Sequence, residues 1–495
     1  MPGCQFSPKA NPRVLPARNR FYRSCGMPAP NVTGWSNGEP SSAIYLQAEL
    51  RYCPAGICPE LVARVLERTV DGELTLISRG PRNMMATGGS EIVSLGSRAA
   101  QTSPRGPITM VVPLPPSYRG GTEEYAYRLA NGFAQSRPTR ILTTTVRWDA
   151  MASLLDTGQA KVERLPAREL LERPVLTSRT SWARLRDSVA ASSLVNLHMP
   201  FPGVEASVAR EARRHGIPVV LTYHMDADLA SAMPGPGASL LTKLYQRLSA
   251  HPALDSCDTV VANSRGYAES SEVLSRHLPK VTVIPKGVDP QRLGIGAYDG
   301  ERDPPPCIPT ERFRGDVSRL LFVGRLVPYK GIGVLLGAVE NLARRGKDVG
   351  LIVAGKGPLR LELEQLAIRL RITDKVVFVG FVPDAQLGDL YRFADVTVVP
   401  SLGVLESSAT TLEEAAACGC PVVGSDLPGA GESIPNDRVR GWLVPAGDVP
   451  ALATAIEQMI ATPRPPPPTK IRTWLDVKND YLALFDKLGL SASSP

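Results

Sequence analysis

Two carboxylates eight positions apart give the chain its most distinctive chemical pattern. Glu406 lies in a polar segment that follows the apolar run 396–399, and Glu414 lies in a segment typical of a helix. Carboxylates placed in this way can accept hydrogen bonds from the hydroxyl groups of a sugar or a ribose. A structural explanation is also open, in which Glu406 is a solvated loop residue and Glu413–Glu414 form the charged face of a helix. The pair by itself does not decide between the two.

Arg325 and Lys330 form a second charged pattern, in the string G-R-L-V-P-Y-K-G that follows the apolar run 320–323. Fixed cations stabilise the negative charge that develops on a diphosphate as it leaves a substrate. Arginine offers a planar fork to phosphate oxygens, whereas lysine offers a point charge. Taken alone, loop cations of this kind are usually solvated surface charges, so both interpretations stay open at this point.

The elements that must position these residues read as strands and helices in alternation. The apolar run 396–399 predicts a buried strand, residues 412–418 predict a helix, and Val422 opens the next strand. Gly419 and the proline two positions later fit the end of that helix. Similar alternation begins at Ile108 and predicts an α/β protein with doubly wound sheets. Ligands of such sheets bind at the carboxyl ends of the strands, where helix N-termini offer unpaired N–H groups.

The string from Pro400 to Asp426 resembles the E-x7-E segment of retaining glycosyltransferases of family 4, including the A-C-G-x-P-V-V motif that follows the second glutamate. The resemblance covers about Ile108–Leu488 and implies two Rossmann-like doubly wound domains with an interdomain cleft, the GT-B fold. The chain departs from the family at Ser408 and Ala409, where an aromatic or apolar residue and then glycine are usual. It departs again at Lys286, in P-K-G-V-D-P, where the family usually has asparagine.

The resemblance also implies roles for the residues that carry chemistry. Glu406 would contact the donor sugar and position it, and Arg325 and Lys330 would bind the diphosphate. His198 and His224 each follow an apolar strand, and in the family such histidines face the cleft, where one contacts the reacting sugar or the acceptor. The structural alternative for both is a histidine that caps a strand end through hydrogen bonds. Because the sequence places no enzymatic nucleophile, the family's retaining front-side displacement is the expected reaction course.

A further set of residues is implied in binding the donor nucleotide. It comprises Gly120, Gly121, Gly324, Gly355, Gly357, Ser408, Ala409, Thr410 and Glu414. Among them Glu414 would meet the ribose, and Gly355 and Gly357 belong to a G-x-G-P loop near the base. Glycines at such places also form tight turns, and this role is compatible with close approach to a ligand. The dinucleotide fingerprint G-x-G-x-x-G is not present at the Gly120–Gly121 loop.

The organisation that we predict has three parts and a linker. Residues 1–104, rich in scattered proline, glycine and serine, form an N-terminal extension for which we expect disorder, with a short helix over Pro59–Arg68. The acceptor domain spans residues 105–297 and is completed by a C-terminal helix within residues 470–495. A linker over residues 298–315 leads to the donor domain over residues 316–465.

Composition narrows the class of partner. The formal net charge of +8 favours acidic partners such as nucleotide phosphates and is compatible with peripheral contact with an anionic membrane. No long basic block is present, and we expect no nucleic acid partner. Histidines and cysteines form no metal-ligand pattern, so we expect no metal and no cofactor besides the nucleotide-sugar co-substrate.

Asp226–Asp228 spells the D-x-D of the other glycosyltransferase fold, but that motif belongs to a single-domain architecture. Without an export signal or a long apolar stretch, a cytoplasmic location is expected.

The function that we predict is a retaining, metal-independent glycosyltransferase. It would move a sugar from a nucleoside-diphosphate sugar to an acceptor that is a sugar, a lipid-linked molecule or another small molecule. One alternative is an epimerase of the GT-B fold, which would act on the nucleotide sugar and need no acceptor. Another is a non-catalytic protein that binds nucleotide sugars, which the altered residues Ser408 and Ala409 favour.

Overall fold

A computed structural model describes most of the chain beyond residue 105. The described residues are 106–115, 121–146, 158–170, 173–227, 236–295, 305–306, 308–313, 315–403 and 410–489, with the backbone of five strands between residues 45 and 76. The chain divides into two units, Met1–Ala99 and Ala100–Pro495.

The first unit contributes short antiparallel strands. They are β1 (Tyr45–Glu49), β2 (Tyr52–Cys53), β3 (Gly56–Ile57), β4 (Val62–Arg68) and β5 (Leu74–Leu76). Strands β1, β4 and β5 form one sheet, and β2 pairs with β3. The helix predicted over Pro59–Arg68 is therefore wrong, because residues 62–68 pair along their length with β1 and β5. Two β-branched valines in this segment favour the extended conformation. The rest of the extension lies outside the described residues.

The first sheet of the second unit has seven parallel strands in the order β14-β13-β12-β11-β6-β7-β8. Its strands are β6 (Ile108–Val111), β7 (Thr139–Thr144), β8 (Lys161–Leu165), β11 (Leu194–Met199), β12 (Val219–Tyr223), β13 (Thr259–Ala262) and β14 (Val281–Val283). From β6 the sheet grows through β7 to β8 on one side, and then from β11 to β14 on the other. The reversal between β6 and β11 is a topological switch point, where sheets of this kind bind ligands.

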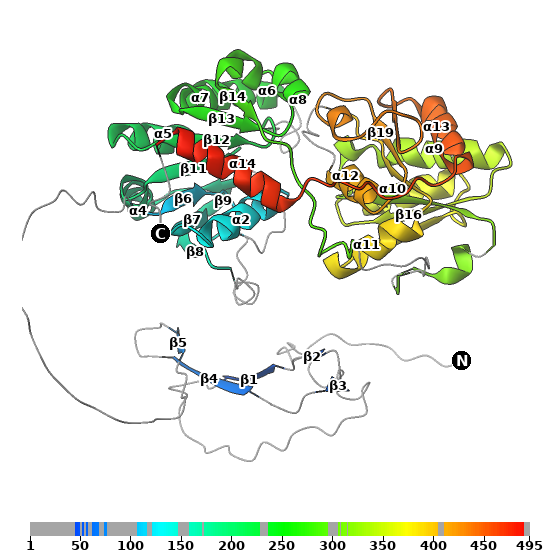
Figure 1. The fold of residues 1–495 in the computed structure, drawn as a ribbon, viewed down its shortest axis with the longest axis horizontal. Coiled ribbons are helices and arrows are strands. Elements are labelled where there is room, and N and C mark those ends of the chain that lie inside the picture. Colours follow the sequence, from blue (N-terminus) through cyan, green and yellow to red (C-terminus); the bar gives the residue numbers. More distant parts are fainter. Residues whose placement is uncertain are drawn as a thin grey trace, which may run out of the picture. The chain divides into compact units, whose positions relative to one another are not determined.

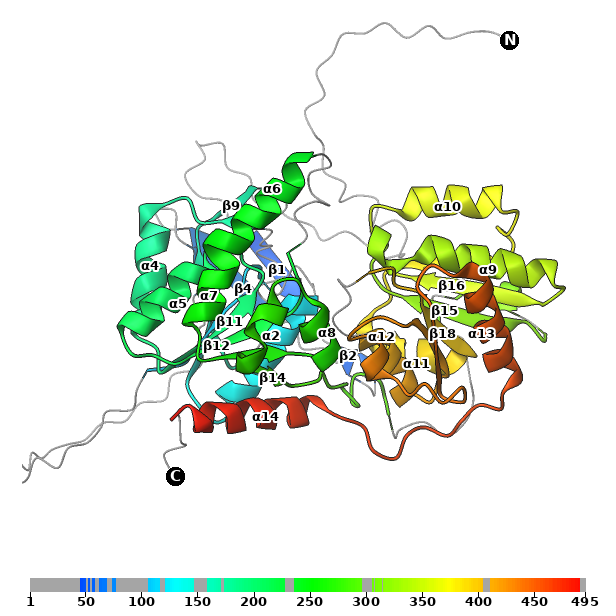
Figure 2. The same ribbon diagram turned by 90° about the horizontal axis from the view of Figure 1, so that it is seen from above.

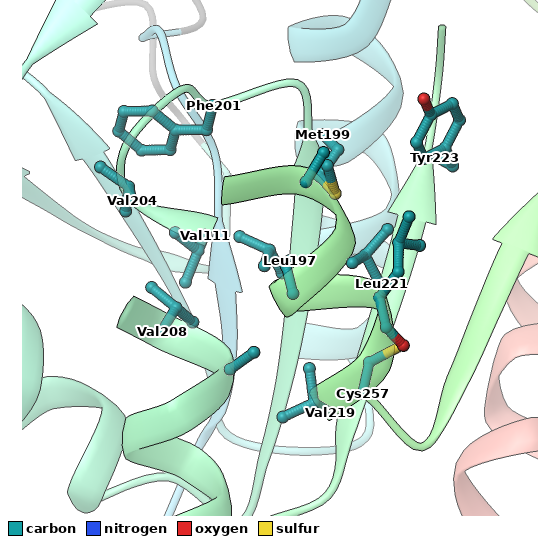
Figure 3. Close-up of a cluster of buried hydrophobic side chains, with 14 of the residues drawn as sticks. Val111, Leu197, Met199, Phe201, Val204, Val208, Val219, Leu221, Tyr223 and Cys257 are labelled. Carbon is teal, nitrogen blue, oxygen red and sulfur yellow. The ribbon is translucent and has the colours of Figure 1, made fainter. Parts of the chain in front are cut away.

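Helices and a hairpin flank this sheet. They are α2 (Gly121–Ala134), α4 (Arg179–Ala190), α5 (Glu205–Arg214), α6 (Pro236–Tyr245), the π-helical turn η2 (Gln246–Ala250), α7 (His251–Ser256), α8 (Arg265–Ser270), the 3-10 segment η3 (Leu274–Lys280), and the paired strands β9 (Arg168–Leu170) and β10 (Arg173–Val175). Figure 3 shows the core on one face of the sheet, where Val111, Leu197 and Leu221 from three neighbouring strands lie next to Val208 of α5. Burial of these apolar side chains fixes α5 against β11 and β12, and α7 packs against α5.

The second sheet has six parallel strands in the order β17-β16-β15-β18-β19-β20. They are β15 (Ser318–Val323), β16 (Val349–Ala354), β17 (Val376–Gly380), β18 (Val396–Val399), β19 (Val422–Ser425) and β20 (Gly441–Val444). The associated helices are α9 (Ile332–Arg344), α10 (Arg360–Arg369), α11 (Asp384–Phe393), α12 (Thr410–Ala417) and α13 (Val449–Ala461) (Figure 1). The two sheets confirm the predicted fold class of two Rossmann-like domains, while the predicted domain boundaries stay predictions.

The last helix, α14 (Trp474–Lys487), returns to the first sheet and packs beside α2 (Figure 1). Tyr481 is its buried anchor, since its hydroxyl lies 3.3 Å from the Tyr125 hydroxyl and 3.0 Å from Thr222 Oγ1. Phe485 packs against Phe133 with ring centroids 5.2 Å apart. The helix therefore brings residues near the C-terminus close to the strand ends of the first domain.

Glycines allow the loops at the carboxyl ends of the second sheet to lie against one another. A Cβ atom on Gly355, after β16, would overlap the Gly324 carbonyl oxygen after β15. A Cβ atom on Gly331, which precedes α9, would overlap the Pro400 carbonyl oxygen after β18. Gly331 also has a left-handed backbone, with φ of +66°. These contacts fix the loop that carries Arg325 and Lys330 relative to its neighbours on both sides.

Replacing Gly331 tests this packing. Gly331→Ala combines left-handed strain with a collision against a backbone carbonyl, whereas Gly346→Ala has similar strain, at φ of +75°, and open space around its Cβ. The control change should cost about 1 kcal/mol of unfolding free energy, and Gly331→Ala should cost about 1–3 kcal/mol more. Denaturant unfolding of both variants measures the difference. Equal losses would show that the loops do not pack tightly at Gly331.

Candidate active site

Two histidines form a buried pair at the carboxyl ends of neighbouring strands. His198 is in β11, His224 directly follows β12, and His198 Nδ1 lies 2.9 Å from His224 Nε2 with the rings stacked. Burial lowers the pKa of His198 to about 3. Burial and then the charges of His198 and Lys286 lower the pKa of His224 well below its usual value. Both rings are therefore neutral near pH 7, and one ring nitrogen donates a hydrogen bond to the other.

Aromatic side chains from distant elements surround the histidine pair. Tyr125 of α2 meets His224 edge to face, with ring centroids 5.2 Å apart. Trp474, the first residue of α14, packs edge to face against Tyr125, with ring centroids 5.1 Å apart. Within the described part of the chain, His198 Nε2 is buried and has no hydrogen-bond partner. The pair is thus held by packing, with one ring nitrogen left to bind a further group.

Glu123 is a candidate site residue that the sequence pattern did not reveal. It follows Gly121 near the start of α2 and is 5% exposed. Burial raises the pKa of its carboxyl group to about 7, although the positive charges of Arg173 and Arg325 oppose this shift. Arg325 belongs to the second domain, so its charge acts on a carboxyl group of the first. The signal in the sequence is weak, a glutamate that follows a glycine pair at the start of a helix.

Lys286 is a second residue that the sequence analysis did not assign to the site. Its Nζ lies 3.4 Å from Oγ1 of Thr410, the first residue of α12, and its charge acts on His224 in the first domain. The lysine therefore lies near both the histidine pair and the N-terminus of α12. The sequence does mark this position, because lysine stands where the family usually has asparagine.

Arg325 and Lys330 lie together at the carboxyl end of β15. Arg325 directly follows Gly324, and Lys330 ends the short 3-10 turn η5 (Pro328–Lys330) before α9. The Lys330 side chain passes over Gly324, with its Cε 4.0 Å from where a Cβ on that glycine would lie. The neighbouring G-x-G-P loop is tied to the same segment, since the Leu326 N–H donates to the Lys356 carbonyl at 3.0 Å. Two cations therefore share one edge of the second sheet.

Glu414 already has side-chain partners. Its Oε1 accepts from Arg292 and its Oε2 accepts from the Tyr391 hydroxyl at 2.9 Å. Burial raises the pKa of the Glu414 carboxyl group, and the positive charge of Arg292 opposes the shift. Arg292 also lies 3.5 Å from Asp384 of α11 and 3.9 Å from Glu124 of α2. The predicted ribose ligand is thus part of an ion-pair network that includes residues of both domains.

Two family models match the chain. The model described as "Glycosyltransferase Family 4" matches residues 119–292, and the model described as "Glycosyl transferases group 1" matches residues 309–472. The chain belongs to the group 1 glycosyltransferases of the family 4 type.

Curated members of this family are similar over parts of their length. The chain is 30% identical to the O-antigen chain mannosyltransferase C of Escherichia coli, over 54% of this chain and 65% of that protein. It is 32% identical to the D-inositol 3-phosphate glycosyltransferase 2 of Catenulispora acidiphila, over 54% of this chain and 63% of that protein. The alignments therefore span less than two thirds of these relatives.

Solved structures of the same fold cover more of the chain. HepE of Anabaena, in complex with UDP and glucose, matches 77% of this chain and 99% of its own with a TM-score of 0.57 and 19% identity. Sucrose-phosphate synthase from Thermosynechococcus elongatus matches 78% and 99% with a TM-score of 0.56 and 20% identity. These likenesses establish the GT-B fold.

The predicted site residues fall into two sets. Those in the described part of the chain lie at the carboxyl ends of the two sheets or within the following helix; they are Gly121, His198, His224, Gly324, Arg325, Lys330, Gly355, Gly357, Thr410 and Glu414. Gly120, Glu406, Ser408 and Ala409 lie outside the described residues. Among the described residues, no three His, Cys, Asp or Glu side chains form a group that could hold a metal ion. The role given to each residue stays a prediction.

Protonation of the histidine pair should destabilise the fold. The pKa of His198 is about 3 in the folded chain, below its usual value of 6.5, so the unfolded chain binds more protons between these two pH values. Stability is therefore full above pH 6.5 and falls as the pH decreases, by up to about 1.4 kcal/mol per pH unit for one histidine. His198→Gln should flatten the dependence of unfolding free energy on pH between 5 and 7.

The exposed His215, which lies 3.3 Å from Glu211, provides the substitution control, since His215→Gln should change the slope less than His198→Gln does. Denaturant unfolding at several pH values measures both slopes. An unchanged slope in a folded His198→Gln variant would contradict the neutral, buried state of this residue.

Proposed function

We propose that the protein is a retaining glycosyltransferase that moves a sugar from a nucleoside-diphosphate sugar to an acceptor held by the first domain. The supporting observation is geometric: the buried His198 and His224 end two neighbouring strands of the first sheet, and Lys286 reaches Thr410 of α12, with its Nζ 3.4 Å from Oγ1. Cationic side chains that can bind a diphosphate thus lie near buried side chains that can form hydrogen bonds with hydroxyl groups. Family membership supports the same reaction class.

In the proposed reaction the bond between the anomeric carbon and the diphosphate oxygen breaks. Negative charge develops on that oxygen, and Arg325 and Lys330 stabilise it without a metal ion. The acceptor hydroxyl attacks the same face of the sugar, and its proton passes to the departing diphosphate. Glu406 orients the donor sugar. The new glycosidic bond therefore keeps the configuration of the donor.

The neutral histidine pair is suited to hydrogen bonding in this scheme. A neutral imidazole can donate from one nitrogen and accept at the other, so His198 or His224 can orient a sugar or acceptor hydroxyl. Glu123, whose pKa is about 7, changes its protonation state near neutral pH and can accept a hydrogen bond from the acceptor when ionised. Lys286 adds positive charge beside Thr410, close to the N-terminus of α12.

The proposed partners are a nucleotide-sugar donor and a sugar, lipid-linked or small-molecule acceptor. Structures of the Anabaena protein contain UDP and glucose in one case and UDP-glucose in another, which supports a donor of this class. No described helix is both long enough and apolar enough to cross a bilayer. We propose a cytoplasmic location with peripheral contact at an anionic membrane.

Release of nucleoside diphosphate tests this function. The protein is first screened for thermal stabilisation by nucleotide sugars, since a ligand at 100 times its Kd stabilises by about 2.7 kcal/mol. Each stabilising donor is then assayed for release of the diphosphate and for a changed sugar. A transferase releases the diphosphate, whereas an epimerase changes the sugar and a simple binding protein does neither.

Arg325→Ala should lower kcat by at least about 30-fold, which corresponds to about 2 kcal/mol of lost transition-state stabilisation. The control is Arg344→Ala, which removes a cation whose side chain is 71% exposed on α9 and should leave turnover unchanged. Steady-state kinetics of both variants make the comparison. If a folded Arg325→Ala variant kept the wild-type kcat/KM, Arg325 would not belong to the site.

The two glutamates should affect different ligands. Glu414→Gln should weaken the binding of the free nucleoside diphosphate and of the intact donor by about 1–3 kcal/mol. Both ligands should be affected because both carry the ribose. Glu406→Gln should impair the donor and turnover while leaving the affinity for the sugar-free nucleotide nearly unchanged. Calorimetric titrations of both ligands into both variants measure this.

Arg292→Gln is the control, because it breaks the ion pair with Glu414 but keeps the carboxylate. If Arg292→Gln weakened nucleotide binding as much as Glu414→Gln does, the loss would come from the broken ion pair and not from a lost ribose contact. If Glu406→Gln weakened binding of the sugar-free nucleotide as much as Glu414→Gln does, the assignment of roles to the two glutamates would be wrong.

A further inference from the structure

Three large apolar side chains are exposed in a row on α6 and the turn that continues it. Leu240, Leu244 and Leu248 are 71%, 48% and 61% exposed and recur every fourth residue. Residues four apart lie on one face of a helix. Single exposed leucines are ordinary on protein surfaces, but a row of three at helical spacing forms a continuous apolar face. We refer to this face as the leucine row.

Two basic residues accompany the leucine row. Lys243 and Arg247 are both exposed, and each lies three positions after a leucine of the row. Residues 236–250 contain no aspartate or glutamate. The outer face of this helix therefore combines apolar and positively charged side chains without a neutralising carboxylate of its own.

The opposite face holds the helix on the domain. The Tyr245 hydroxyl donates to Glu205 Oε1 at 2.8 Å, and Ser249 also donates to this buried carboxyl group. Leu241 packs against the core of the first domain. Figure 2 shows α6 along its length, continuing into α7 on the outside of the first sheet. The anchored inner face keeps the leucine row directed to solvent.

We propose that the leucine row docks on the surface of an anionic lipid bilayer. Leucines of an amphipathic helix enter the boundary between headgroups and acyl chains, while lysine and arginine reach lipid phosphates. The proposal rests on the proposed function, in which a lipid-linked molecule is one class of acceptor. Since α6 is the first described helix after His224, docking here would hold the domain that carries the histidine pair at the membrane surface.

Charge favours a lipid surface over a second copy of the chain. Two copies of the leucine row facing each other would bring four basic side chains together, and like charges repel. An anionic bilayer instead attracts Lys243 and Arg247 while accepting the leucines. A contrasting case is α10, where Leu361 and Ile368 are 65% and 64% exposed but Glu362 is exposed beside them.

Flotation of the full chain with lipid vesicles tests the proposal. Wild-type protein should bind vesicles that mix phosphatidylglycerol with phosphatidylcholine, and should bind pure phosphatidylcholine far less. Replacing all three residues of the leucine row with glutamine should lower binding at least about tenfold. Lys243→Gln with Arg247→Gln should lower binding to the anionic vesicles by about fivefold for each charge at low ionic strength.

The matched control is Leu361→Gln with Ile368→Gln on α10, which removes similarly exposed apolar area and should leave vesicle binding unchanged. Circular dichroism confirms that each variant is folded. Absence of binding by the wild type, or equal binding by all variants, would overturn the proposal. So would a wild-type dimer in sedimentation that the leucine-row variant abolishes while vesicle binding stays the same.

Diphosphate release without vesicles separates this proposal from the proposed function. The leucine-row variant should release nucleoside diphosphate from a nucleotide sugar at the wild-type rate in solution, because these residues lie outside the site. If the wild type bound vesicles but showed no turnover, the docking proposal would stand and the proposed transferase activity would be wrong.

Discussion

Parallel pairing of the strands is the constraint on which the site depends. In the seven-stranded and the six-stranded sheet every neighbouring pair is parallel, so all strands end at one edge and the following loops must share that edge. Close packing of the loops is then unavoidable. In the second domain it is achieved with glycine, because Gly355 and Gly331 lie directly against backbone carbonyls. In the first domain it brings His198 and His224 within hydrogen-bond distance. The same geometry thus sets both the backbone requirement for glycine and the burial that keeps the histidines neutral.

An ion-pair network joins residues of the two domains through the segment that follows β14. Arg128 of α2 binds Asp289 at 2.6 Å, the Arg292 N–H donates to Asp289, and Arg292 binds Glu414. A buried carboxylate is costly unless it is paired, which explains why Glu414 has both Arg292 and Tyr391 as partners. A ribose that binds Glu414 must share or displace these partners. If Glu414 binds the ribose as proposed, nucleotide binding and the linkage between the domains would involve the same carboxylate.

The sequence predicted what depends on local pattern and missed what depends on burial. Apolar runs such as 396–399 and the glycine that ends α12 were sufficient to predict the parallel strands and the helix between them. Strand β8 was not predicted, because Lys161–Leu165 is short, largely polar and paired only with β7. Glu123 reads as an ordinary charge in the first turn of a helix, and only its burial in the folded chain makes its pKa unusual. The partners of Glu414 had no signal at all, since Arg292 and Tyr391 are distant from it in sequence.

The distribution of charge in the site follows from the same burial. The groups that burial makes neutral near pH 7 are His198 and His224, and Glu123 is only partly ionised there. Lysine and arginine with long side chains can keep their charged ends hydrated while their stems are covered. Arg325, Lys330 and Lys286 therefore supply positive charge that the neighbouring neutral groups do not cancel. This distribution of charge suits the proposed nucleotide-sugar donor, because the cations could bind the diphosphate while the neutral groups form hydrogen bonds with hydroxyl groups.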